Sequence, residues 1–247
     1  MIGDLRAATL RVEGAGGDEV EAYLAQPLDQ EPRGGVVVIH HMPGYDAGML
    51  EATRRFAAHG YLAICPNLYS REAPGADPDD AAAAARAAGG VPDDRLIGDV
   101  AGAAAYLRAM STSNGEVGTI GYCSGGRQSF LAACSLDLDA AVDCYGAFVV
   151  GTPPQTHPLQ VSPLIDRVGE LRCPLLGLFG AEDVRPSPED TAVLAQALTD
   201  AGKPFEFHTY EDAGHAFFAT ERPGYRPAAA KDGWRRIWAF IGEHLGG

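Results

Sequence analysis

EVGTIGYCSGG, residues 116–126, is the stretch of this sequence that decides its fold. Residues 116–120 have the composition of a buried strand, and a helical pattern follows the stretch through Cys134. Between them lies Gly121-x-Cys123-x-Gly125, a pattern that makes a sharp strand-to-helix turn and lifts the central side chain above the sheet. Glycine is needed at both flanks because larger side chains would collide with the neighbouring strand and helix. The stretch therefore predicts an accessible nucleophile, Cys123.

Strand-like and helix-like segments alternate on both sides of this turn. Further buried strands are expected at residues 35–39, 61–65, 140–144, 174–179 and 205–210, and helices at 49–59, 94–110, 191–201 and 228–245. Repeated strand–helix units predict the α/β class, with a mostly parallel central sheet and helices on both faces. Residues 8–12 and 19–25 alternate apolar and polar side chains around a glycine-rich turn, which predicts an N-terminal antiparallel hairpin. Residues 70–93 fit a helix or a lid, and no linker divides residues 1–247, so a single domain is expected.

A thiol nucleophile needs a base and a group that orients the base. In the fold that this turn indicates, the chain order is nucleophile, acid and histidine. Asp183 follows the predicted strand 174–179, and His215 follows the predicted strand 205–210. Glu182 is the alternative acid. Ser124 is the alternative nucleophile, but a turn centred there would need glycine at position 122, which is tyrosine.

The amide of Ser124 begins the predicted helix, where the helix N-terminus favours negative charge. Its N–H group, with that of His41 or Met42 after the first central strand, is the predicted oxyanion hole.

Composition and charge exclude several classes of function. The chain has 247 residues, is 46% hydrophobic and carries a formal net charge of -14, so it would repel the phosphates of nucleic acids. The first 14 residues do not resemble a signal peptide, and no apolar run is long enough for a membrane span. The five cysteines include no CxxC pair, which predicts free thiols and a cytoplasmic location rather than a disulfide framework or a metal site.

The sequence resembles the dienelactone hydrolase family of α/β-hydrolases over nearly its whole length. The motifs that carry this resemblance are Cys65-Pro66-Asn67-Leu68-Tyr69, Arg71, Ala73-Pro74-Gly75, Ser113-Asn114-Gly115, Gly121-Tyr122-Cys123-Ser124-Gly125-Gly126, Tyr145-Gly146, Gly180-Ala181-Glu182-Asp183 and Ala213-Gly214-His215-Ala216-Phe217. The resemblance implies an α/β-hydrolase fold and a Cys-His-Asp triad, which Cys123, His215 and Asp183 match. It also implies hydrolysis through an acyl-enzyme without a cofactor.

Three positions depart from the pattern of family members that act on dienelactone. His41 stands where those members have a glutamate that restrains the resting thiol. Ala219 stands where they have one of two carboxylate-binding arginines, and Arg86 only loosely matches the other. These departures predict a substrate range shifted from dienelactone toward neutral or bulkier esters, and a His41 that favours the thiolate of Cys123. The pocket is expected to contain Tyr45, Arg71, Arg86, Tyr145 and Phe217.

The predicted activity is hydrolysis of an ester or lactone, similar to that of a carboxymethylenebutenolidase. A thiolate expels a good leaving group most readily, which favours activated esters, enol lactones and thioesters over amides. The predicted partner is a small-molecule substrate, with a possible homo-oligomer and no nucleic acid or membrane. Two alternatives stay open: acyl transfer or rearrangement in a biosynthetic pathway, and a ligand sensor on the same fold.

Overall fold

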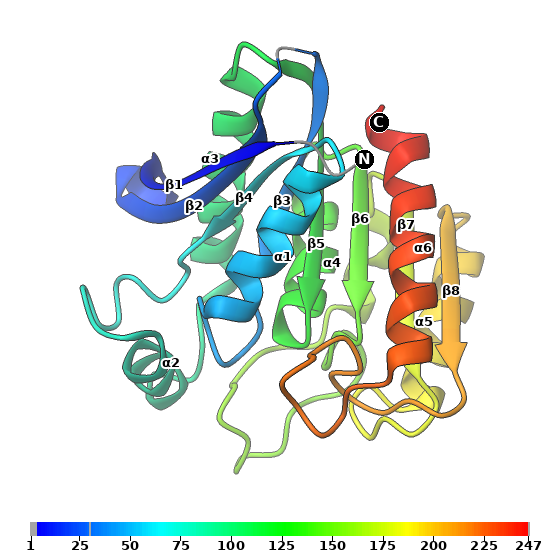
Figure 1. The fold of residues 1–247 in the computed structure, drawn as a ribbon. Helices are drawn as coiled ribbons and strands as arrows, with labels where there is room; N and C mark the ends of the chain where they lie inside the picture. The colour runs from blue at the N-terminus through cyan, green and yellow to red at the C-terminus, as the bar shows by residue number, and fades with distance from the viewer. Residues whose placement is uncertain (1–3, 30, 247) are drawn as a thin grey trace.

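The computed structural model describes residues 4–29 and 31–246, so the first three residues of the N-terminal segment lie outside the described part. An eight-stranded sheet in the order β1-β2-β4-β3-β5-β6-β7-β8 runs through the molecule (Figure 1). Its strands are β1 (Leu5–Glu13), β2 (Glu19–Pro27), β3 (Arg33–Ile39), β4 (Leu62–Pro66), β5 (Ser113–Tyr122), β6 (Ala140–Cys144), β7 (Leu175–Gly180) and β8 (Phe205–Tyr210). The β1–β2 hairpin and the β2–β4 pair are antiparallel, and all other pairs are parallel.

Helices cover both faces of this sheet (Figure 1). The helices are α1 (Ala47–Ala58), α2 (Pro78–Ala87), α3 (Asp93–Ala109), α4 (Ser124–Ser135), α5 (Pro188–Asp200) and α6 (Pro227–Leu245), with 3₁₀ turns η1 (Ala15–Gly17) and η2 (Ile165–Glu170). Helices α1 and α6 pack on one face, and α3, α4 and α5 pack on the other. The predicted α/β-hydrolase fold, with its N-terminal antiparallel hairpin, is confirmed.

Strand β3 shows why the central strands are continuous apolar runs in the sequence. Val36 and Val38 belong to the core beneath α1 and α6, whereas Val37 and Ile39 belong to the core on the opposite face. Successive side chains of a strand point to opposite faces, so a sheet covered on both sides buries every one of them. The residue directly after the strand therefore emerges at the carboxyl edge of the sheet, where the site lies.

The predicted elements and the observed ones differ mainly at their ends. Strands β6 and β8 have the predicted bounds, but α5 begins at Pro188 rather than at residue 191. The Ser187 hydroxyl caps that helix by accepting a hydrogen bond from the Asp190 N–H group, and the Asp190 carboxylate accepts one from the Ser187 N–H group. This capping box accounts for the earlier start. Within residues 4–29 and 31–246, no helix is long and apolar enough to cross a membrane.

Candidate active site

Cys123 occupies the turn between β5 and α4 with a strained backbone. Its φ of 56° and ψ of -121° are rare for a residue with a side chain. A Cβ atom at Gly121 would lie 1.8 Å from the carbonyl oxygen of Gly125, and one at Gly125 would lie 2.3 Å from that of Ile39. The Cys123 N–H group donates to the carbonyl of Cys144 on β6, at 3.0 Å, which fixes the turn to the sheet. The two glycines thus let helix, strand and thiol approach one another.

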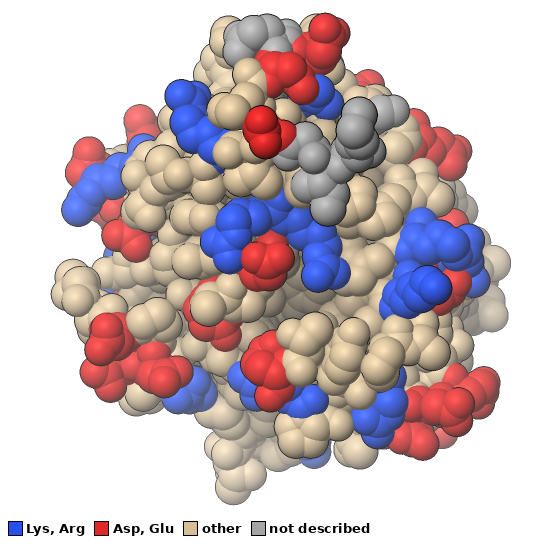
Figure 2. Space-filling view, in the orientation of Figure 1, with Lys and Arg blue, Asp and Glu red and all other residues tan. Residues whose placement is uncertain are grey.

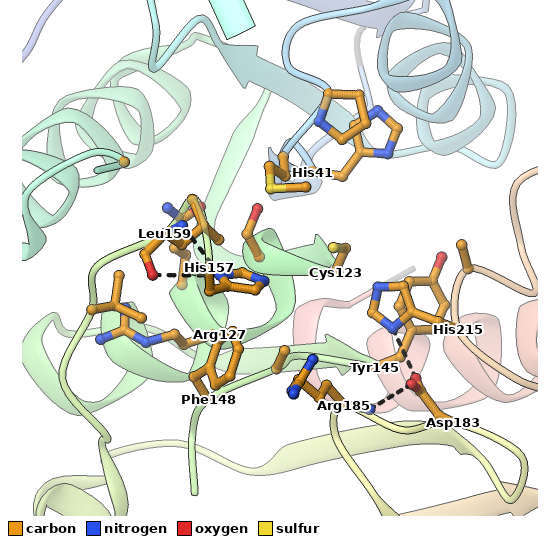
Figure 3. Close-up of a pocket in the computed structure, with 18 of the residues that line it drawn as sticks. His41, Cys123, Arg127, Tyr145, Phe148, His157, Leu159, Asp183, Arg185 and His215 are labelled. Carbon is orange, nitrogen blue, oxygen red and sulfur yellow. Dashed lines mark hydrogen bonds and ion pairs between the residues drawn. The ribbon is translucent and has the colours of Figure 1, made fainter. Parts of the chain in front are cut away.

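His215 and Asp183 stand beside this thiol at the carboxyl ends of β8 and β7 (Figure 3). The Nδ1 atom of His215 lies 2.8 Å from Oδ2 of Asp183, and the interaction of the ring with the Cys123 thiol shifts the pKa of both groups. Asp183 is only 6% exposed, and its Oδ1 accepts the N–H group of Arg185 at 2.8 Å. The neighbouring Glu182 is exposed, and the carboxylate that His215 binds is that of Asp183. The structure therefore brings Cys123, His215 and Asp183 together at one edge of the sheet.

These contacts change the ionisation of both reactive groups. Burial alone would raise the pKa of Cys123, but the hydrogen bond and charge of His215 outweigh it and lower the pKa below its ordinary value of 9.0. Burial alone would lower the pKa of His215, yet its bonds with Asp183 and Cys123 raise it to about 10. Each group thus favours the charged form of the other: His215 lowers the pKa of the thiol, and the thiol raises the pKa of the imidazole.

Two backbone N–H groups point at the sulfur of Cys123. They belong to Ser124, at the start of α4, and to Met42, in the loop after β3. Both contacts contribute to the low pKa of the thiol because N–H dipoles stabilise a nearby anion. Of the two residues predicted to complete an oxyanion hole with Ser124, the structure places the amide of Met42, rather than that of His41, against the sulfur.

The loop that carries Met42 is held by a histidine that the sequence analysis left without a role. His40 is 1% exposed, and its Nδ1 donates to the carbonyl of His41 at 2.9 Å while its Nε2 accepts the N–H group of Leu68 at 3.2 Å. Burial lowers the pKa of His40 to about 4, so the ring is neutral and can both donate and accept. The hydroxyl of Tyr69 donates to the carbonyl of Met42 at 3.1 Å and restrains the same loop.

His41 itself contacts a carboxylate rather than the thiol. Its Nε2 lies 2.6 Å from Oδ2 of Asp46, the residue that caps α1. The groups that shift the pKa of Cys123 do not include His41. The prediction that His41 favours the thiolate therefore finds no contact to support it, and the ring instead ties the Met42 loop to the start of α1.

A cavity of about 370 Å³ opens over the thiol. Its lining combines the triad with apolar and cationic side chains (Figure 3). The lining residues are His41, Met42, Pro43, Tyr69, Gly90, Val91, Cys123, Ser124, Arg127, Gln128, Tyr145, Ala147, Phe148, His157, Leu159, Val161, Asp183, Val184, Arg185, His215, Ala216 and Arg222. Tyr145, predicted from the sequence, is among them, and its ring packs edge-on against His215 with centroids 5.1 Å apart.

Four residues predicted for the pocket lie outside its lining. Phe217 is fully buried and packs against Tyr145, Tyr210 and Phe218 in the core, and Tyr45 packs against the core beneath α1 and α6. Arg71 is held by two carboxylates, Asp18 at 2.7 Å and Asp99 at 2.8 Å. Arg86 lies in the last turn of α2. Residue type and nearness in sequence do not reveal which way a side chain points, and the structure places these four away from the lining of this cavity.

Three arginines that the sequence analysis did not select line the cavity instead: Arg127, Arg185 and Arg222. Arg185 had a signal in the sequence, since it follows Asp183 by two residues on the same loop. Arg127 lies one helical turn after Cys123, on the same side of α4. Within the described residues, no group of three or more His, Cys, Asp or Glu side chains is placed to hold a metal ion.

The fold is that of an α/β-hydrolase, with a cysteine at the turn between β5 and α4. A family model described as "Dienelactone hydrolase family" matches residues 20–245. The chain is 32% identical over 230 residues to a carboxymethylenebutenolidase of Pseudomonas putida, covering 90% of each protein. It is 35% identical over 238 residues to a Salmonella typhimurium protein named as a candidate carboxymethylenebutenolidase, covering 93% of this chain and 85% of the relative.

A solved structure agrees with these sequence matches. A Klebsiella pneumoniae protein described as a candidate dienelactone hydrolase superposes with a TM-score of 0.84 and 31% identity, over 98% of this chain and all of that one. The chain therefore belongs to the dienelactone hydrolase family, and it is a hydrolase that acts on esters or lactones.

Proposed function

We propose that this chain is a cysteine-dependent hydrolase that cleaves an ester or lactone through a covalent acyl-enzyme on Cys123. The observation that carries the proposal is the placement of Asp183, His215 and Cys123 in one cavity, with 2.8 Å between the carboxylate and the imidazole. A thiolate with a protonated imidazole beside it is already prepared for attack on a carbonyl carbon. The apolar cavity above it suits a small organic substrate.

The proposed cycle uses groups that already lie around the sulfur. The thiolate forms a bond to the carbonyl carbon, and the N–H groups of Ser124 and Met42 bind the resulting oxyanion. When the tetrahedral intermediate collapses, the bond to the leaving oxygen breaks and the imidazolium of His215 protonates that oxygen. His215, now neutral, takes a proton from water, and the hydroxide cleaves the thioester. The acid product leaves, and the thiolate and imidazolium are restored.

This cycle favours substrates whose leaving oxygen is a weak base, such as aryl esters and enol lactones. The two alternatives, acyl transfer or rearrangement and ligand sensing, are not favoured by the comparisons. Residues 1–247 as one domain, a cytoplasmic location, a possible homo-oligomer and independence from cofactors stay predictions. So does the exclusion of nucleic acid as a partner.

The acyl-enzyme can be trapped directly. A 4-nitrophenyl ester should give a burst of nitrophenolate equal to the enzyme concentration, and mass spectrometry of the quenched protein should find the acyl group on the peptide that contains Cys123. Cys123→Ala should lose both burst and turnover, whereas Cys173→Ala, at a buried thiol that does not line the cavity, should keep both. Turnover in H₂¹⁸O should place one labelled oxygen in the acid. Full activity in Cys123→Ala would refute the proposal.

A further inference from the structure

A second cavity, of about 660 Å³, lies between α1 and α6 on one face of the sheet. These two helices lie in front of the sheet in Figure 1, and Figure 2 shows the same face, where basic side chains gather beside a hollow. We propose that this cavity binds a small planar aromatic compound that carries an anionic oxygen. Such binding goes beyond the proposed hydrolysis and does not require a reaction at Cys123.

The walls of this second cavity are largely aromatic and aliphatic. Helix α6 supplies Trp234 and Trp238, helix α1 supplies Met49 and Ala52, and the loop before α6 supplies Phe218. The two indole rings stack with centroids 5.0 Å apart, and Phe218 meets Trp234 edge-on at 5.6 Å. Aromatic side chains arranged in this way favour another ring, because ring pairs attract one another beyond the burial of their surface. A planar ligand also loses less conformational freedom on binding than a flexible one.

Tyr122 places an unused hydrogen-bond donor at this cavity. Its side chain lines the cavity and is 3% exposed, and its hydroxyl is buried without a hydrogen-bond partner within residues 4–29 and 31–246. Burial keeps the pKa of the phenol well above its ordinary value of 10.0, so the hydroxyl stays protonated and can donate. A buried polar group that lacks a partner is destabilising. A ligand oxygen that accepts from this hydroxyl would remove that cost.

Arg55 supplies a cation in the same part of the cavity. Its guanidinium lies over the Trp234 ring, 4.7 Å from the ring centroid, and it has no ion pair in the described part of the chain. Its charge opposes the rise that burial causes in the pKa of Tyr122, which shows that the guanidinium acts on the hydroxyl. An anionic oxygen near both groups would accept a charge-assisted hydrogen bond from the arginine and a second bond from the tyrosine.

The acidic side chains of the cavity already have basic partners. Glu51 binds Arg54 at 2.9 Å, and Glu221 lies 4.0 Å from Arg222. Lys231 also lines the cavity, and it forms no ion pair with the residues that the structure describes. The charge that remains for a ligand is therefore positive, and it favours an anion over a cation.

The second cavity is separate from the one over the thiol. Of the described residues, only His41 and Tyr145 line both cavities, whereas Cys123 and His215 line the catalytic cavity alone. A ligand between α1 and α6 therefore leaves the thiol uncovered. Binding there should continue when the catalytic cavity is blocked.

The chain carries its own reporter for this site. Its two tryptophans, Trp234 and Trp238, both line the second cavity. Pyrene-1-sulfonate is a planar aromatic anion that absorbs where tryptophan emits, so its binding should quench tryptophan fluorescence by energy transfer. We expect saturable quenching with about one probe per chain, as a single cavity requires. The same titration after alkylation of Cys123 with iodoacetamide should give an unchanged Kd.

The anionic oxygen is tested by a matched neutral probe, pyrene-1-methanol, and by charge variants. Pyrene-1-sulfonate should bind more tightly than the neutral probe to wild type. Arg55→Gln should reduce this preference roughly tenfold or more, the effect of losing a charged hydrogen bond. Arg235→Gln is the matched control, because Arg235 is on α6 but outside the lining, and it should keep the preference within about twofold. Tyr122→Phe should weaken sulfonate binding roughly 2- to 10-fold, as expected for a neutral hydrogen bond.

The position of the probe is tested by filling the cavity. Ala219 lines the second cavity, so Ala219→Phe should abolish saturable quenching. Val193→Phe adds the same ring at a position on α5 that is 50% exposed, and it should bind the probe as wild type does. Loss of binding after alkylation of Cys123 would place the probe over the thiol and overturn the inference. Wild-type affinity in both Arg55→Gln and Ala219→Phe would also overturn it, because the probe would then bind elsewhere.

Discussion

Replacing Asp183 with asparagine removes one negative charge from the proposed triad and leaves the volume of the side chain almost unchanged. The carboxylate is 6% exposed and lies 2.8 Å from Nδ1 of His215. A hydrogen bond to a charged group contributes about 1.5–3 kcal/mol, which corresponds to roughly 10- to 150-fold in rate. The amide can also hold the imidazole in the wrong tautomer, and in serine-protease triads the same change lowers kcat about 10⁴-fold. We expect kcat/KM of Asp183→Asn to fall roughly 100- to 10⁴-fold.

The ionisation of the nucleophile should change in the same variant. Asp183 helps to raise the pKa of His215 to about 10, so its loss lets that pKa fall toward the ordinary 6.5. A less stable imidazolium stabilises the thiolate less, and the pKa of Cys123 should rise toward 9.0. The rate of iodoacetamide alkylation, followed from pH 5 to 10, measures this shift directly, and its midpoint should move to higher pH.

Glu182→Gln is the matched control, because it changes the adjacent carboxylate, which is exposed, whereas the carboxylate that His215 binds is that of Asp183. It should change kcat/KM by less than about twofold, as is usual for surface charges. Equal losses in the two variants would refute the assignment of Asp183. So would an alkylation midpoint that stays at its wild-type pH in Asp183→Asn.

Three further predictions concern other residues of the site and its surroundings. In wild type, the rate of Cys123 alkylation by iodoacetamide should have its midpoint below pH 9. Cys134 should react far more slowly, because burial raises its pKa to about 12. Peptide mapping that found Cys134 labelled first would contradict this prediction. His41→Gln should lower kcat, because the ring holds the Met42 loop through its contact with Asp46, and it should leave the pH midpoint of Cys123 alkylation unchanged. A shifted midpoint would show that His41 acts directly on the ionisation of the thiol. Arg71→Gln should lower the free energy of unfolding by roughly 3 kcal/mol, because it leaves the buried carboxylate of Asp99 without its ionic partner, and kcat should stay unchanged. Urea denaturation measures the loss of stability. An unaltered urea midpoint of unfolding would contradict this prediction.

The sequence predicted the parts of the site that local backbone geometry determines. The positions of Cys123, Asp183 and His215 follow from one rule, namely that residues directly after parallel strands meet at the same edge of the sheet. Gly121 and Gly125 encode the turn because any side chain there would collide with backbone atoms. Such constraints act over a few residues, so they are visible without knowledge of the rest of the molecule.

The pocket was predicted poorly because its lining depends on side-chain direction and on distant partners. Arg71 seemed available for an anionic ligand, but Asp99, 28 residues further along the chain, binds it at 2.8 Å. No role was predicted for Arg185, yet among the described residues it is the arginine of the cavity that has no ion pair. An arginine's role depends on which carboxylates the fold brings to it, and no local pattern records that.

His40 and His41 show the same limit within two adjacent positions. Both follow β3, and the sequence assigned a role to His41 alone, but consecutive residues leave a strand toward opposite sides. His40 is directed into the core, where burial holds it neutral and lets one ring donate to the His41 carbonyl and accept from the Leu68 amide. His41 is directed toward α1 and contacts Asp46. The two histidines thus fix the loop from opposite sides, and the amide of Met42 between these supports lies close enough to the sulfur to lower the pKa of the thiol.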